Sequence, residues 1–215
     1  MNETENYIIV SIGHTAAGKT SLLNYLSNKL NLSYIEEGQI KRDLLPAEYT
    51  SKDSLNEDLR DKAYKIAIER AILLLKEKRN IALDASFHRN YRRQWVYDLL
   101  VNNLDLKPII IWLYVYCNNK YKVKIRINNR FNSNTKTAKN QADKFYIFEH
   151  IINTFDEVNL SSFPANYRSI ILNVDTDENE LSFNASNFCN EYNQPTFIKL
   201  INNLITVYLK NQKNK

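Results

Sequence analysis

The order of apolar and polar positions along the chain predicts strands that alternate with helices. Short apolar runs, each bounded by polar residues, have the length and composition of buried strands. We expect five such strands, at residues 7–12, 33–36, 81–84, 109–116 and 169–174.

Between these runs, apolar residues recur at the three- and four-residue spacing of helices. We expect helices at residues 19–30, 56–78, 89–102 and 195–210. In the long helix at 56–78, the predicted buried stripe consists of Leu59, Ala63, Ile66, Ala67, Arg70, Leu73 and Leu74. Strands separated by helices indicate a parallel sheet. The pattern therefore predicts an α/β fold with a five-stranded parallel sheet and helices on both faces.

The composition fits one globular domain covering residues 1–215, since 44% of the chain is hydrophobic and 25% is charged. No apolar run approaches the roughly 18 residues of a membrane span, and the polar start of the sequence is unlike a signal peptide. Cys117 and Cys189 are far apart without metal-ligand spacing, which fits a reducing compartment. We expect a cytoplasmic protein with no membrane partner.

Two of the three glycines of the chain lie in one motif with the pattern GxxxxGK(S/T), which spans residues 13–20. The motif follows an expected strand and leads into an expected helix, an arrangement that surrounds a polyphosphate with backbone N–H groups. The Lys19 ammonium is expected to neutralise the β- and γ-phosphates, and the Thr20 hydroxyl to ligate Mg²⁺. The expected nucleotide-binding residues are Gly13, His14, Thr15, Ala16, Ala17, Gly18, Lys19, Thr20 and Ser21.

The charge is uneven and supports an anionic partner. The chain carries a formal net charge of +5, and the segment 107–144 contains nine lysines and arginines against one anion, Asp143. Such a segment suits the phosphates of a nucleotide or a nucleic acid.

Missing motifs separate the classes of P-loop protein. Signalling GTPases need DxxG and NKxD, and the sequence contains neither. Motor or AAA-type ATPases use an acidic pair at a strand end to hold Mg²⁺ and activate water, whereas here Asp84 is followed by Ala85. Without a second carboxylate, transfer to an acceptor is favoured over hydrolysis, and the pattern indicates a small kinase.

The run from Asn80 to Arg93, NIALDASFHRNYRR, resembles the signature of the P-loop kinase-like ATPases, a group with polynucleotide kinases, zeta-toxin-like kinases and small-molecule kinases. The resemblance implies a P-loop NTPase three-layer sandwich, ATP as phosphoryl donor and Mg²⁺ as cofactor. It also implies a small helical lid at about residues 118–145. Asp84 would hold Mg²⁺ together with Thr20.

Arg126 and Arg130 are four residues apart, which places both guanidiniums on one face of a helix. Planar guanidinium suits both base stacking and bidentate phosphate contact. Similarity to adenylate-kinase-like lids suggests Arg126 for the base and Arg130 for the transferred phosphate.

The acceptor site is expected across from the P-loop, after the second and third strands. A hydroxyl acceptor needs a carboxylate base, for which Glu37 is the candidate and Asp84 the alternative. A phosphate acceptor needs arginines instead. The expected substrate-binding residues are Glu37, Arg42, His88, Arg89 and Arg92, with Arg93 as a further candidate clamp.

Three functions stay open on the sequence. The favoured one is an ATP- and Mg²⁺-dependent phosphotransferase acting on a hydroxyl of a small molecule or a polynucleotide end. The first alternative is a nucleoside-monophosphate kinase. The second is a regulatory NTPase in which the basic segment binds nucleic acid.

Overall fold

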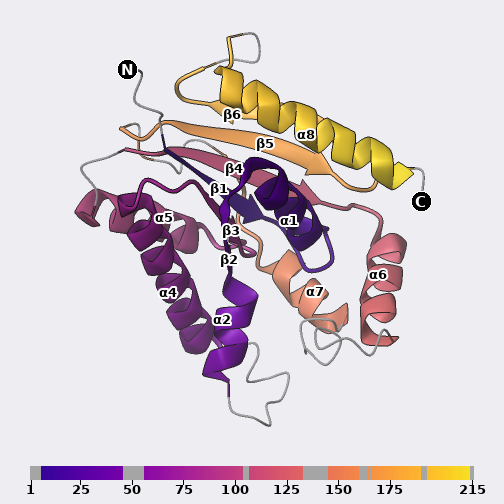
Figure 1. The fold of residues 1–215 in the computed structure, drawn as a ribbon. Helices are drawn as coiled ribbons and strands as arrows, with labels where there is room; N and C mark the ends of the chain where they lie inside the picture. The colour runs from indigo at the N-terminus through magenta and orange to yellow at the C-terminus, as the bar shows by residue number, and fades with distance from the viewer. Residues whose placement is uncertain are drawn as a thin grey trace.

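Six strands form one sheet in the part of the chain that the computed structural model describes, which is residues 6–45, 56–103, 107–132, 145–159, 164, 166–189 and 193–213 (Figure 1). The strands are β1 (Tyr7–Ile12), β2 (Ser33–Glu36), β3 (Ile81–Asp84), β4 (Ile109–Tyr116), β5 (Ser169–Asp175) and β6 (Glu180–Ser186). Their order across the sheet is β2-β3-β1-β4-β5-β6. The first five are parallel, as the sequence predicts.

The sixth strand corrects the prediction of a five-stranded, wholly parallel sheet. β6 pairs antiparallel with β5 through a tight turn, in which Asn179 takes a left-handed conformation with φ 58°. Leu181 and Phe183 alternate with polar residues and pack on the core. This period-two pattern was present in the sequence, but its asparagines and serines made it resemble a loop.

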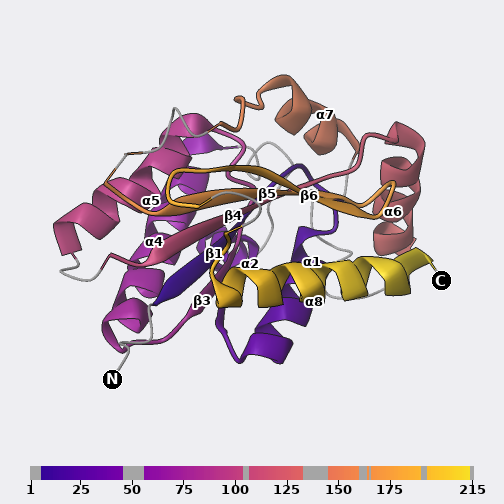
Figure 2. The ribbon, with the colours of Figure 1, turned by 90° about the horizontal axis from the view of Figure 1, so that it is seen from above.

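Helices cover both faces of the sheet, as expected. They are α1 (Lys19–Leu30), α2 (Glu37–Leu44), α4 (Glu57–Lys76), α5 (Asn90–Asn103), α6 (Lys120–Asn132), α7 (Phe145–Asn153) and α8 (Thr196–Lys213). Two of these, α2 and α7, were not predicted. Figure 2 shows α1 and α8 together on one face of the sheet, with α4 and α5 on the other. None of the helices in the described ranges combines the length and the apolarity that crossing a membrane requires.

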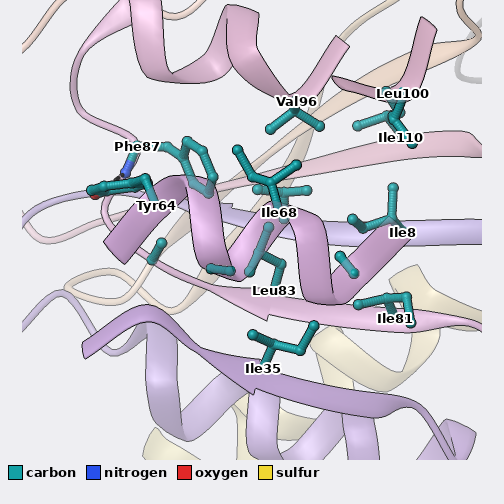
Figure 3. Close-up of a cluster of buried hydrophobic side chains, with 14 of the residues drawn as sticks. Ile8, Ile35, Tyr64, Ile68, Ile81, Leu83, Phe87, Val96, Leu100 and Ile110 are labelled. Atoms are coloured by element: carbon teal, nitrogen blue, oxygen red, sulfur yellow. Dashed lines mark hydrogen bonds between the residues drawn. The ribbon is translucent and has the colours of Figure 1, made fainter. Parts of the chain in front are cut away.

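Two apolar cores result from the alternation of side chains along the strands. Ile8 and Val10 of β1 point toward α4 and α5, where they join the cluster drawn in Figure 3. Ile9 points the other way and packs in the cluster of α1 and α8. Because every central strand is buried on both sides, the sheet is rigid and its carboxyl edge can hold a site in fixed geometry.

The buried face of α4 differs from the predicted stripe. Ala63 and Ala67 are buried as expected, but Leu73 is 61% exposed. The residues that α4 buries are Arg60, Ala63, Tyr64, Ala67, Ile68, Ala71, Ile72 and Leu75. The run Leu73-Leu74-Leu75 fits two helical phases, and packing against β2 and β3 selects the one that contains Tyr64 and Arg60. The helix begins after Asn56, whose side chain accepts a hydrogen bond from the Leu59 N–H.

This assignment predicts different costs for two neighbouring substitutions. Leu75→Ala removes a side chain that is 1% exposed, so it should lower the free energy of unfolding by about 2–5 kcal/mol. Leu73→Ala should lower it by less than about 1 kcal/mol. Urea denaturation of both variants measures the difference, and equal losses would place the helix in the phase that the sequence pattern favoured.

Candidate active site

The loop between β1 and α1 requires glycine at two positions. Gly13 has φ 144°, and a Cβ added there would lie 1.9 Å from the Val115 carbonyl oxygen. Gly18 has φ 102° and caps α1 in a left-handed conformation. A side chain at either position would force the backbone to move. The two glycines of the motif therefore shape a loop that passes close to β4 and turns into the helix.

Lys19 lies inside the loop, as the motif predicts. Its Nζ donates to the Gly13 carbonyl at 2.9 Å and to the His14 carbonyl at 2.7 Å. The Gly13 N–H in turn donates to the Ser86 carbonyl at 2.9 Å, so the loop is tied to the segment that follows β3. The side chain of Lys19 is thus held with its charge in the concave part of the loop.

His14 contributes its side chain as well as its backbone to the loop. The Cys117 N–H donates to Nε2 at 3.2 Å, so the ring proton sits on Nδ1, which donates to the Thr15 carbonyl at 2.8 Å. The ring meets Phe148 of α7 edge-on, with centroids 5.0 Å apart. Burial lowers the pKa of His14 to about 4, and the nearby charge of Lys19 adds to this effect. His14 is therefore a neutral link between the loop, β4 and α7.

Asp84 is a buried carboxylate that receives three hydroxyl hydrogen bonds. Its Oδ1 accepts from Ser11 at 3.1 Å, and its Oδ2 accepts from Thr20 at 2.6 Å and from Tyr34 at 2.8 Å. The contact brings together the two residues that the sequence analysis assigned to Mg²⁺. Tyr34, on β2, was missed, although its place two residues before the end of a strand beside β3 was a usable signal.

The chemistry of this pair fits Mg²⁺. A hydroxyl and a carboxylate are hard oxygen ligands, and Mg²⁺ in nucleotide sites takes few protein ligands besides phosphate oxygens and water. Among the described residues, no group of three or more His, Cys, Asp or Glu is placed to hold a metal. A P-loop cation would not need such a group, because Thr20 and Asp84 would be its protein ligands and phosphate oxygens and water would supply the rest.

A cavity of about 470 Å³ lies beside the loop on the α6 and α8 side. It is lined by Ala16, Gly18, Ser21, Lys122, Arg126, Asn129, Thr176, Asp177, Asn179, Tyr208, Leu209 and Gln212. Arg126 reaches it from α6 and donates to the Thr176 hydroxyl at 2.9 Å, the Thr176 carbonyl at 2.9 Å and the Ala16 carbonyl at 3.3 Å. The arginine predicted to contact the base thus borders a cavity next to the phosphate loop.

The predicted lid is only partly described. Its first helix, α6, packs through Val123 and Ile127 against Ala16 of the loop and Phe148 of α7. Arg130 lies on α6, but its side chain is outside the described residues, and so is the segment 133–144. The predicted role of Arg130 at the transferred phosphate stays a prediction.

On the acceptor side, Glu37 is the first residue of α2 and is 7% exposed. The four arginines that the sequence analysis predicted to bind substrate all make contacts within the protein. Arg42 bonds Glu36 at 2.8 Å, and Arg89 lies 3.7 Å from Asp156. The two others are fully buried: Arg92 pairs with Glu57 and Asp61, and Arg93 donates to the carbonyls of Phe87, Asp156 and Glu157. These arginines fix the loop after β3 and the packing of α4 against α5.

Two further basic residues lie on the acceptor side: Arg60, which the sequence analysis missed, and Lys41. Arg60, on α4, is 5% exposed and contacts the buried His88. Lys41, one helical turn after Glu37, has its pKa lowered by burial, against the raising effect of Glu37. Arg60 lies on the buried face that the structure shows for α4 and not on the predicted one, which is why it was missed.

Comparison with known proteins agrees with this geometry. The family model described as AAA domain matches residues 8–142. A search of curated proteins gives no significant match. Among solved structures, a protein from Chloroflexus aurantiacus J-10-fl has TM-score 0.59 at 15% identity, covering 92% of this chain and 96% of that one. A fungal RNA kinase has TM-score 0.56 at 15% identity, covering 95% and 96%. A gluconokinase from Sinorhizobium meliloti 1021 has TM-score 0.51 at 13% identity, covering 99% and 98%.

These matches confirm a nucleotide-binding P-loop domain with the fold of small kinases, and with it the resemblance stated from residues 80–93. The sequence analysis set AAA-type ATPases aside because Asp84 has no acidic neighbour. The matching family is itself described as an AAA domain, so setting proteins of that name aside was wrong. The observation behind it holds, since Asp84 is followed by Ala85 and not by a second acidic residue.

The neutral state of His14 predicts a dependence of stability on pH. Its pKa is about 4 in the folded protein against 6.5 ordinarily, so between these values the unfolded chain binds more protons. The contribution is fully present above pH 6.5 and is lost as the pH falls toward 4, by up to about 3 kcal/mol. Urea denaturation at pH 7 and pH 5 should show a smaller loss for His14→Gln than for wild type. Identical losses would contradict the assignment.

Proposed function

Because the chain belongs to the AAA domain family, we propose that it is an ATP- and Mg²⁺-dependent kinase that transfers the γ-phosphoryl group to an acceptor hydroxyl. The observation that carries the proposal is the convergence of Lys19, Thr20 and Asp84 at the loop, with Ala85 in place of a second carboxylate. An enzyme that activated water would need such a group beside the cation.

Two of the structural neighbours support transfer rather than hydrolysis. One is described as an RNA kinase and the other as a gluconokinase, so this fold serves acceptors of very different size. The proposal for this chain accordingly covers a small molecule or a polynucleotide end.

On the nucleotide side, each residue has a task that follows from its position. Lys19 exchanges the carbonyls of Gly13 and His14 for phosphate oxygens, which are better partners for an ammonium. Thr20 and Asp84 would hold Mg²⁺, which when bound neutralises charge on the β- and γ-phosphates. Arg126 borders the cavity that would take the adenine base.

On the acceptor side, we assign Glu37 as the general base. It is buried at the start of α2, directly after the strand that pairs with β3, and therefore near Asp84 and the loop. Asp84 is a poor alternative, because both of its oxygens already accept hydroxyl hydrogen bonds. Lys41 lies one turn along the same helix, so its ammonium is close to this carboxylate.

The nucleoside-monophosphate kinase alternative loses support from the contacts of the arginines. A clamp for an acceptor phosphate needs guanidiniums that face the substrate, whereas Arg42, Arg92 and Arg93 bond to the protein itself. The nucleic-acid alternative depends on the basic segment, of which Lys122 is paired with Asp177. Both remain distinguishable by experiment.

The test is transfer of labelled γ-phosphate from ATP in the presence of Mg²⁺. Acceptors are offered in separate reactions: nucleoside monophosphates, 5′-hydroxyl RNA and DNA oligonucleotides, and polyols with sugar acids. A labelled product that disappears with Lys19→Ala supports the kinase and identifies its acceptor class. Label found only as free phosphate, or a product unaffected by Lys19→Ala, would refute it.

The role of Glu37 predicts a specific kinetic effect. Glu37→Gln should lower kcat by about 10²–10⁴-fold with the KM for ATP nearly unchanged, because it removes the base and leaves the loop intact. Glu36→Gln is the matched control, since Glu36 bonds Arg42 and is partly exposed. It should change kcat by less than about threefold. A kcat for Glu37→Gln that equals that of the control would exclude the assignment.

A further inference from the structure

A cluster of buried basic groups lies between α2, α4 and the segment that follows β3. Arg60 of α4 is 5% exposed, while His88 and Arg92 are fully buried. His88 lies in the segment that follows β3. In the same segment, the Ser86 carbonyl accepts the hydrogen bond from the Gly13 N–H. His88 of the cluster is therefore two residues from the point at which the loop contacts this segment.

Two buried nitrogen atoms of this cluster have no hydrogen-bond partner among the described residues. Arg60 contacts Nε2 of His88 at 3.4 Å, and since a guanidinium only donates, the ring proton of His88 sits on Nδ1. That Nδ1 is one of the two atoms, and Nη1 of Arg92 is the other. The guanidinium of Arg92 lies over the Tyr64 ring, 4.7 Å from its centroid. Buried donors are nearly always paired in folded proteins, so the N–H at Nδ1 of His88 points to an acceptor that a ligand would supply.

The surroundings of His88 are electrically positive. Burial lowers its pKa to about 2, and the charges that add to this effect are those of Arg60, Arg92, Arg89 and His150. The carboxylates that pair with the arginines, Glu57 and Asp61, keep 49% and 27% of their side-chain surface exposed. Water screens these two carboxylates. Glu37 is buried, but its charge is offset by Lys41 one helical turn away. The interior of the cluster thus favours an added negative charge.

We propose that Arg60 and His88 bind an anionic group of the acceptor, a carboxylate or a phosphate carried on the same molecule as the hydroxyl that is phosphorylated. Arg60 supplies the charge, because its only carboxylate partner among the described residues, Glu57, is 49% exposed and screened by water. His88 supplies a neutral N–H donor. Glu37 and Arg60 both act electrostatically on Lys41 and Tyr64, so they lie in one region, and one molecule would place its hydroxyl at Glu37 and its anionic group at Arg60. This inference rests on the proposed kinase function for the identity of the ligand as acceptor, and on the structure alone for the anion site.

A binding experiment tests the anion site without requiring turnover. The protein is first saturated with Mg²⁺ and a non-hydrolysable ATP analogue, which occupies the P-loop, and inorganic phosphate is then titrated by calorimetry. Phosphate should bind wild type and should bind Arg60→Gln at least about tenfold more weakly. His88→Gln, which removes the Nδ1 donor, should also weaken binding. Arg70→Gln, an exposed position of the same helix, is the matched control and should bind like wild type.

Phosphate that binds equally to wild type and to both cluster variants, or that fails to bind wild type, would overturn the inference. Thermal denaturation of each variant shows that the fold is retained. His88→Gln leaves the ion pair between Arg60 and Glu57 in place. This variant therefore tests the inference even if Arg60→Gln does not fold.

Kinetics with matched pairs of acceptors then show whether the bound anionic group is a carboxylate or a phosphate. Gluconate is compared with glucose, and adenosine 3′-monophosphate with adenosine. The charged member of one pair should have the higher kcat/KM, and Arg60→Gln should reduce the ratio within that pair at least tenfold, while Arg70→Gln preserves it. A ratio that Arg60→Gln leaves unchanged contradicts the inference but not the kinase. Arg60-dependent phosphate binding without transfer to any acceptor refutes the kinase but not the anion site.

Discussion

The hydrogen bonds to the Asp84 carboxylate are the interaction on which the rest of the site depends. A carboxylate at the end of a buried strand is costly unless its oxygens are paired, and here three hydroxyls pair it. The three come from different elements: Ser11 from β1, Thr20 from α1 and Tyr34 from β2. Satisfying one buried charge therefore fixes the strand edge and the helix that together form the nucleotide site.

The same arrangement divides the carboxyl edge of the sheet into two sides. Toward α6 and α8, the cavity bordered by Arg126 and Thr176 has the size for a nucleoside. Toward α2 and α4, Glu37, Arg60 and His88 are buried, and Lys41 of α2 lies near Glu37 and Arg60. A donor on one side and an acceptor on the other would meet at Lys19, which is the arrangement that in-line transfer needs.

Local signals in the sequence predicted the fold well, and they located the P-loop. The bounds of β1, β2, β3, β4 and α1 follow directly from apolar runs and the glycine motif, and Asp84 from its place at a strand end. The phase of α4 was wrong, because three consecutive leucines fit two faces and only packing decides between them. Tyr34 and Arg60 were missed because their partners are 50 and 28 residues away along the chain. The strand-end position of Tyr34 was a usable signal, but Arg60 could be placed only once the buried face of α4 was known.

The most direct test of the account is a crystal structure with Mg²⁺ and a non-hydrolysable ATP analogue. We expect the base in the cavity beside Arg126, Nζ of Lys19 on the β- and γ-phosphate oxygens, and the cation held by Thr20 with Asp84 next to it. A nucleotide bound elsewhere, or Lys19 still bonded to the carbonyls of Gly13 and His14 with phosphates present, would contradict the central claim that this loop positions the phosphoryl group for transfer.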